Sequence, residues 1–203
     1  ALVKLACMLL AAGLSRRLGQ PKQLLPWQGS TLVRYSAQVA LAAQLDPIVV
    51  VTGHHADAVQ AQVHDLAVTC IYNDAYADGQ GSSVACGARW LLTQSPACDA
   101  VVVLLCDQPF LTAKHVTQCV AAWALHRPDV LIPRVDGVRT NPVIWAVHAL
   151  PLLAQLTGEQ GGRVLFTQGV VTPAFVDIAD KDLLIDIDTH ADYLAVQHRI
   201  EES

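Results

Sequence analysis

Short apolar runs alternate along this chain with segments of helical spacing, and this alternation limits the fold more than any other property of the sequence. The clearest runs are AVVVLL at residues 100–105 and PIVVVT at residues 47–52. Both are apolar nearly throughout and rich in β-branched residues, which indicates β-strands that are buried on both faces. Five further strands are predicted, at residues 4–10, 68–72, 130–133, 142–145 and 173–177.

The segments between the predicted strands place apolar residues three or four positions apart, as amphipathic helices do. Residues 31–43 form the clearest example, with Ser30 as the expected N-cap. Thr112 and Thr189 are the expected N-caps of two later helices. The other helices are predicted at residues 56–63, 82–92, 113–125, 147–153, 161–168 and 189–199.

The alternation predicts an α/β fold with a Rossmann-like, mostly parallel sheet and helices on both faces. The composition agrees, because 53% of the residues are hydrophobic but only 5% are aromatic, so Ala, Val and Leu must fill the core. A chain of 203 residues without repeats or a linker-like stretch is expected to form a single domain, residues 1–203. In such a sheet the carboxyl ends of the strands share one edge, where ligands bind.

Charge and composition exclude several kinds of partner. The net charge is −5 and the sequence has no basic stripe, which argues against nucleic acid as a partner. The apolar stretch at residues 5–12 is too short to cross a bilayer and is followed by cations instead of a signal-peptide cleavage site. The six cysteines form no C-x-x-C pair, and the histidines are scattered. We therefore expect a cytoplasmic protein with free thiols, no membrane contact and no transition-metal site.

The loop after the first predicted strand reads LAAGLSRRLGQPK and spans residues 10–22. Its small residues allow the backbone to approach a ligand closely and to aim N–H groups at phosphate oxygens. Arg17 and Lys22 add positive charge where a leaving pyrophosphate would lie. The loop has neither the G-K-[ST] of a Walker A motif nor the spacing of a dinucleotide fingerprint. The residues predicted to bind nucleotide here are Leu10, Ala11, Ala12, Gly13, Leu14 and Ser15.

The segment LLCDQP, residues 104–109, places Asp107 directly after the strongest predicted strand. A carboxylate at the edge of the sheet can hold Mg²⁺, which prefers oxygen ligands and usually shares them with substrate phosphates. Taken alone, Asp107 could equally be a turn residue before Pro109 or the cap of the following helix. Combined with the cationic loop, it is predicted to be a catalytic residue and a ligand of Mg²⁺.

Two later motifs stand at predicted helix starts. GQGSS at residues 79–83 offers backbone amides and hydroxyls that suit a nucleobase or a ribose, although an ordinary capped helix start explains it equally well. DIDT at residues 186–189 places acidic side chains just before a helix, where they interact favourably with its positive end.

The pattern L-A-A-G-x-S-x-R-x-G-x-x-K is matched at every specified position of the 10–22 loop. It resembles the signature loop of the nucleotidyltransferase family that includes the molybdenum cofactor guanylyl- and cytidylyltransferases, and the C-D-Q-P form is most similar to the cytidylyl branch. The resemblance covers most of the chain and implies a nucleotide-diphospho-sugar transferase-like fold. It also implies that Gln80, Gly81 and Ser82 belong to the base and ribose pocket and that Asp188 is the second metal ligand.

Two further segments are similar to the acceptor side of that family's site. RTNPVIW at residues 139–145 has Thr140 where glycine is common, and GEQGGR at residues 158–163 has Glu159 where aspartate is usual. Either segment could instead be a plain turn. The resemblance implies that the acceptor-binding residues are Asn141, Pro142 and Arg163.

Together the motifs predict a Mg²⁺-dependent enzyme that moves CMP from CTP to the phosphate of molybdopterin and releases pyrophosphate. Arg17, Lys22 and Asp107 are the predicted catalytic residues, and Asp107 and Asp188 are the predicted metal ligands. Three alternatives stay open: GTP in place of CTP, a sugar or polyol phosphate as the acceptor, and a non-catalytic nucleotide-binding protein that escorts the cofactor. A molybdoenzyme or its chaperone is the expected protein partner.

Overall fold

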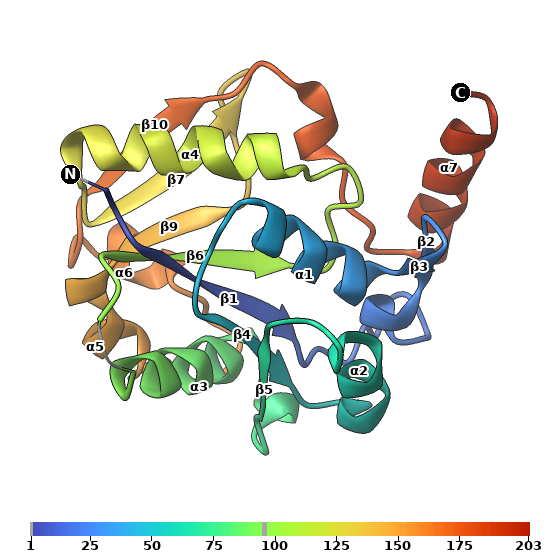
Figure 1. Ribbon diagram of the computed structural model, residues 1–203, viewed down its shortest axis with the longest axis horizontal. Helices are drawn as coiled ribbons and strands as arrows, with labels where there is room; N and C mark the ends of the chain where they lie inside the picture. The colour runs from blue at the N-terminus through green and yellow to red at the C-terminus, as the bar shows by residue number, and fades with distance from the viewer. Residues whose placement is uncertain (1, 95–96) are drawn as a thin grey trace.

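The computed structural model describes residues 2–94 and 97–203 and places helices on both faces of one large sheet (Figure 1). The sheet consists of β1 (Leu5–Ala11), β4 (Ile48–Thr52), β5 (Thr69–Tyr72), β6 (Ala100–Leu105), β7 (Val130–Val135), β8 (Val138–Arg139), β9 (Val143–Ala146) and β10 (Pro173–Asp177). The strand order is β10-β7-β9-β6-β1-β4-β5, and β8 pairs with β7. Two short strands, β2 (Pro26–Trp27) and β3 (Ser30–Thr31), form a separate hairpin. The predicted α/β fold is confirmed.

Strand direction decides which loops meet at the edge that follows β1 and β6. β1 pairs in parallel with β4 and β6, and the β4–β5 and β7–β10 pairs are parallel as well. β9 runs antiparallel to both β6 and β7, with Val103 opposite Val143. The expectation that all the strands share one carboxyl edge is therefore wrong for β9. Because its direction is reversed, the residues that precede β9, Asn141 and Pro142, lie at the edge where β6 ends.

The α-helices follow the predicted positions closely. They are α1 (Leu32–Ala42), α2 (Ala56–Val63), α3 (Gln80–Leu92), α4 (Ala113–His126), α5 (Leu150–Leu153), α6 (Arg163–Thr167) and α7 (His190–Glu201). The helix predicted at residues 147–153 is divided into a 3₁₀ turn, η3 (Val147–Ala149), and the short α5. Pro151 has no N–H to donate to a carbonyl four residues earlier, which favours this division. In the described part of the chain, no helix is long and apolar enough to span a bilayer.

Threonine N-caps mark the first residues of α1, α4 and α7. Thr112 and Thr189 are N-caps as predicted, and each belongs to a capping box in which its side chain accepts the N–H of the third helical residue. The prediction of Ser30 as the cap of α1 is wrong. Thr31 is the cap, because its hydroxyl accepts the N–H of Arg34, whereas Ser30 pairs with Trp27 in the β2–β3 hairpin.

The core consists of two layers separated by the sheet, and alternate residues of β1 enter different layers. Cys7 and Leu9 pack with residues of α1, α2 and α4, whereas Ala6 and Met8 pack with residues of α3 and α5. A third, smaller cluster joins α7 to the β2–β3 hairpin and the start of α1. The third cluster therefore packs the chain segment that returns to the edge of the sheet against the hairpin.

Candidate active site

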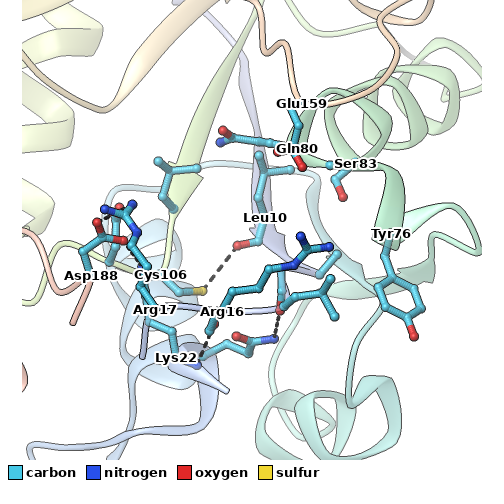
Figure 2. A pocket seen from close by; sticks show the side chains of 18 of the residues that line it. Leu10, Arg16, Arg17, Lys22, Tyr76, Gln80, Ser83, Cys106, Glu159 and Asp188 are labelled. Atoms are coloured by element: carbon cyan, nitrogen blue, oxygen red, sulfur yellow. Dashed lines mark hydrogen bonds and ion pairs between the residues drawn. The ribbon is translucent and has the colours of Figure 1, made fainter. Parts of the chain in front are cut away.

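A pocket of about 390 Å³ opens where β1 and β6 end, and we call it the loop pocket (Figure 2). The 10–22 loop lines one part of it, and the start of α3 lines another. Figure 2 shows Asp188 and Arg17 at the left and Glu159 and Gln80 at the top. The Arg17–Asp188 ion pair therefore lies in one part of the loop pocket, and the Gln80 amide and the Glu159 carboxylate lie in another.

The 10–22 loop has a shape fixed by its own hydrogen bonds. Ser15 adopts a positive φ of 52°, its hydroxyl accepts the N–H of Lys22 at 3.0 Å, and its carbonyl accepts two further N–H groups. A Cβ added at Gly13 would lie within 4 Å of no atom of the described residues, so the backbone there faces open space. Of the residues predicted to bind nucleotide, Leu10, Ala12, Gly13, Leu14 and Ser15 line the loop pocket.

Two cations of the loop converge on one carboxylate. Arg17 forms an ion pair with Asp188 Oδ2, and Lys22 Nζ lies 3.4 Å from Asp188 Oδ1. Asp188 is far away in the sequence, and a backbone hydrogen bond of 2.7 Å from Ile187 N–H to the Asp107 carbonyl brings it to this edge. The capping box of α7 holds it there, because the Asp192 carboxylate accepts the N–H groups of both Asp188 and Thr189.

Asp107 is the most enclosed carboxylate of the pocket. Within residues 2–94 and 97–203, its Oδ1 atom is buried and has no hydrogen-bond partner. Burial raises the pKa of Asp107, and the charge of nearby Lys22 opposes that rise. A buried carboxylate oxygen without a hydrogen-bond donor destabilises the folded protein unless a cation binds it. The unpartnered Oδ1 of Asp107 therefore indicates a cation site.

The donor set around Asp107 fits Mg²⁺. Asp107 and Asp188 both line the loop pocket and offer the carboxylate oxygens that Mg²⁺ prefers. Partial burial, followed by the charge of Asp107, raises the pKa of neighbouring Asp186 to about 6. Among the described residues, no cluster of three or more His, Cys, Asp or Glu side chains could hold a metal ion unaided. A cation held here would therefore need oxygens from a substrate, as Mg²⁺ in nucleotide sites usually does.

A second pocket of about 480 Å³ adjoins the loop pocket, and we call it the Trp145 pocket. Gln80 and Leu105 line both pockets, so the two cavities meet at those side chains. The Trp145 and Phe166 rings lie 6.3 Å apart with a tilt of 30°, and both line the second pocket. Its polar lining includes Arg139, Asn141 and Arg163, so Asn141 and Arg163 share one cavity as expected for an acceptor site.

Four residues predicted for the site do not line either pocket: Ala11, Gly81, Ser82 and Pro142. Ala11 and Pro142 are buried. The Ser82 hydroxyl lies 2.9 and 2.7 Å from the carbonyl oxygens of Ala75 and Gly79, so it stabilises the start of α3. A Cβ at Gly81 would lie 2.3 Å from the Gln160 carbonyl oxygen, so this glycine allows the loop around Glu159 to pack on α3.

Sequence reasoning missed several residues that line the loop pocket. Ser83 belongs to the GQGSS segment but was not assigned to the pocket; it lies there beside Gln80, three positions away on the same face of α3, and that helical spacing was the available signal. Glu159 lies in the loop pocket, although its motif resembles an acceptor loop; Gly161, Gly162 and Arg163 line the Trp145 pocket. The remaining missed residues are Arg16, Gln23, Tyr76, Ala77, Gly79, Leu105 and Cys106.

A cationic loop that faces carboxylates, at the carboxyl edge of a mostly parallel sheet, suits a polyphosphate ligand with a divalent cation. The adjoining cavity provides room for a second substrate. Fold and site define a nucleotidyltransferase, an enzyme that joins a nucleotide to an acceptor.

The chain belongs to the MobA-like NTP transferase domain family, whose model matches residues 7–172. It is 33% identical to the purine catabolism protein PucB of Bacillus subtilis, over 91% of each chain. It is 31% identical to the nicotine blue oxidoreductase of Paenarthrobacter nicotinovorans, over 90% of this chain and 91% of that protein. It is 27% identical to the molybdenum cofactor cytidylyltransferase of Escherichia coli, over 97% of each chain.

Solved structures share the fold over nearly the whole chain. The Rv0371c homologue from Mycobacterium sp. strain JC1 has a TM-score of 0.84 and 26% identity, with 98% of this chain and 97% of that chain covered. A nucleotidyl transferase from Methanothermobacter has a TM-score of 0.79 and 22% identity, with 98% and 99% covered. Rv0371c of Mycobacterium tuberculosis, solved as a manganese complex, has a TM-score of 0.76 and 22% identity, with 95% and 97% covered.

Proposed function

We propose that this protein transfers CMP from CTP to the terminal phosphate of molybdopterin and releases pyrophosphate. The observation that carries the proposal is the meeting of two unlike cavities at Gln80 and Leu105. The loop pocket combines cations and carboxylates as a nucleoside triphosphate with Mg²⁺ requires. The Trp145 pocket combines Arg139 and Arg163 with the half-buried Phe166 ring, while Trp145 itself is almost completely buried in its wall; this lining suits a heterocycle that carries a phosphate.

Each charged residue of the loop pocket has a role in this mechanism. Arg17 and Lys22 face the leaving pyrophosphate and stabilise the charge that it gains, while the loop amides orient it. Asp107 and Asp188 would hold Mg²⁺, which supplies Lewis-acid neutralisation at the α-phosphate when it is bound. The attacking phosphate of the acceptor is already ionised at neutral pH, so the reaction needs no general base. One nitrogen of the exposed Arg17 guanidinium pairs with Asp188, and its other N–H groups are available to phosphate oxygens.

The choice of CTP rests on similarity and not on pocket geometry. The C-D-Q-P segment resembles the cytidylyl branch, and the Escherichia coli relative is named for that activity. The manganese complex of Rv0371c supports a divalent cation in a related fold. Of the other substrates open from the sequence, GTP and a sugar or polyol phosphate would both keep the same mechanism.

The test is pyrophosphate release from CTP, GTP, ATP or UTP in the presence of molybdopterin, with and without Mg²⁺. We expect release with CTP that requires both Mg²⁺ and molybdopterin. Thermal-shift measurements with the same nucleotides report binding separately, because a ligand of the folded state raises the melting temperature. Release with GTP alone would move the proposal to guanylyl transfer. Nucleotide binding without release under any condition would indicate a cofactor-escorting protein and contradict the proposal.

A further inference from the structure

Two glutamine side chains in the described part of the chain are almost completely buried, Gln23 and Gln108, each with an exposed fraction of 3%. A buried amide destabilises a protein unless its polar atoms are hydrogen-bonded. Both glutamines use the side-chain nitrogen for this purpose, and each directs it to three oxygen atoms. Their partners belong to different halves of the site.

Gln108 directly follows Asp107 and forms hydrogen bonds to two separate segments on the acceptor side of the site. Its Nε2 donates to the Asn141 carbonyl at 3.0 Å, the Leu183 carbonyl at 3.1 Å and the Thr140 hydroxyl at 3.3 Å. The Thr140 hydroxyl in turn donates to the Leu183 carbonyl. One side chain therefore joins the segment before β9 to η4 (Lys181–Leu184), the turn that leads to the Asp186–Asp188 carboxylates.

Gln23 has the same function in the 10–22 loop. Its Nε2 donates to the carbonyls of Ala11 and Gly13, at 3.2 Å each, and lies 3.5 Å from the His54 carbonyl. These contacts hold the two ends of the Ala11–Gly13 turn against the loop that follows β4. Gln23 has no contact of this kind with the segment around Asn141 in the described structure.

The orientation of the Gln108 amide is unambiguous, because a rotated amide would place its oxygen against two carbonyl oxygens. In that orientation its Oε1 atom is buried and, within the described residues, has no partner. A buried acceptor without a partner destabilises the folded protein, and an apolar side chain of similar size would avoid that cost. An apolar side chain would fill the same space without an unpartnered oxygen. The N–H donors of Gln108 therefore have a specific role.

We propose that Gln108 is a positioning residue that sets the acceptor segment, residues 140–141, relative to the Asp107 carboxylate, whereas Gln23 independently positions the nucleotide loop. This inference rests on the proposed function, because it assigns the two halves of the site to two substrates. Gln108 lines neither pocket and acts through backbone segments, whereas Gln23 lines the loop pocket and also holds its backbone.

The experiment compares Gln108→Met with Gln23→Met, since methionine has similar volume but no N–H donors. We expect Gln108→Met to raise the KM for molybdopterin at least tenfold, with the KM for CTP and the CTP thermal shift changed less than twofold. Gln23→Met should show the reverse pattern. Hydrogen exchange provides a readout without substrates: the Thr140 amide, bonded to the Pro133 carbonyl, should exchange faster only in Gln108→Met. The Lys22 amide should exchange faster only in Gln23→Met.

Equal changes in both KM values, or faster exchange of both amides in each variant, would mean that the glutamines only support global stability and would overturn the inference. If the wild-type protein transfers no nucleotide, the proposed function fails, while the exchange data still decide whether the two halves of the site are positioned separately. Gln108→Leu is a second apolar variant that loses the N–H donors, and it separates their loss from any effect particular to methionine. We expect it to behave as Gln108→Met does.

Discussion

At the scale of single residues, we expect the largest loss of activity from a substitution of Asp107. We predict that Asp107→Asn lowers nucleotide transfer by roughly 10³-fold or more, since the variant loses a charged ligand at the point where negative charge develops. The melting temperature should stay equal or rise, because burial already disfavours the ionised carboxylate. Pyrophosphate release and calorimetry measure the two effects. The matched control is Asp57→Asn on the exposed side of α2, and near-normal turnover of Asp107→Asn would refute the metal assignment.

A second prediction concerns two neighbouring glycines of the Trp145 pocket. A Cβ at Gly162 would lie 2.3 Å from the Trp145 ring, whereas a Cβ at Gly161 meets no atom of the described residues within 4 Å. Trp145 has an exposed fraction of 3% and cannot move aside easily. We expect Gly162→Ala to lower the melting temperature and to change tryptophan fluorescence, and Gly161→Ala to do neither. Equal behaviour of the two variants would contradict the role of Gly162 as a close-packing residue.

The sequence predicted the charged residues of the site better than its packing. Arg17, Lys22 and Asp107 were predicted from loop charges and a strand end, and Asp188 from the family resemblance; all four line one pocket. The choice between neighbouring serines could not be made, because Ser82 is drawn inward by carbonyl groups of a preceding turn. Gln108 contacts a residue 75 positions away in the sequence, and no local sequence pattern predicts such a contact.

At the scale of elements, the start of α7 links stability to the site. Thr189 caps this helix, and the Asp192 carboxylate accepts the N–H groups of both Thr189 and Asp188. We predict that Thr189→Ala destabilises the protein by about 1 kcal/mol. For a protein of this size, that corresponds to a fall of about 2–4 °C in melting temperature. Thr189→Ser, which keeps the hydroxyl, is the control, and a fall of the same size in Thr189→Ser would show that the cap is not responsible.

The ion pair between α1 and the turn after α2 has a defined dependence on pH. Two nitrogens of the Arg34 guanidinium donate to Asp65, at 2.6 and 3.0 Å, and this hydrogen bonding lowers the pKa of Asp65 to about 2. A carboxyl group with a lowered pKa in the folded state stabilises the protein above its unfolded pKa, near 4. The stability difference between wild type and Asp65→Asn should therefore shrink as pH falls from about 4 toward 2. Urea unfolding at a series of pH values measures it, and a constant difference would contradict the prediction.

Element positions were predictable from apolar periodicity, but strand direction was not. The run at residues 142–145 matches β9 in place, yet its antiparallel course depends on its neighbours β6 and β7. The two-residue strands β2, β3 and β8 are too short to show a period. Ser30 was predicted as a cap because it precedes an apolar segment, and the hairpin contact with Trp27 displaced it.

At the scale of the whole molecule, one sheet separates two core layers, and both layers depend on the same strands. We predict that the protein unfolds in a single cooperative transition. The helices of both layers pack on the same strands, so unfolding of the sheet removes the packing surface of both layers at once. Differential scanning calorimetry should give equal calorimetric and van't Hoff enthalpies. Two resolved transitions would contradict a single domain over residues 1–203, which stays a prediction.

The ion pair between Arg17 and Asp188 joins two groups that the proposed ligands would also need: Arg17 for a phosphate and Asp188 for a cation. Whatever draws Asp188 away from Arg17 leaves that guanidinium available to phosphate oxygens, and any phosphate that captures Arg17 leaves Asp188 available to a cation. Thermodynamic linkage requires the two effects to be equal in size. On the proposed assignment of Asp188 as a cation ligand, we therefore expect nucleotide and divalent cation to bind cooperatively.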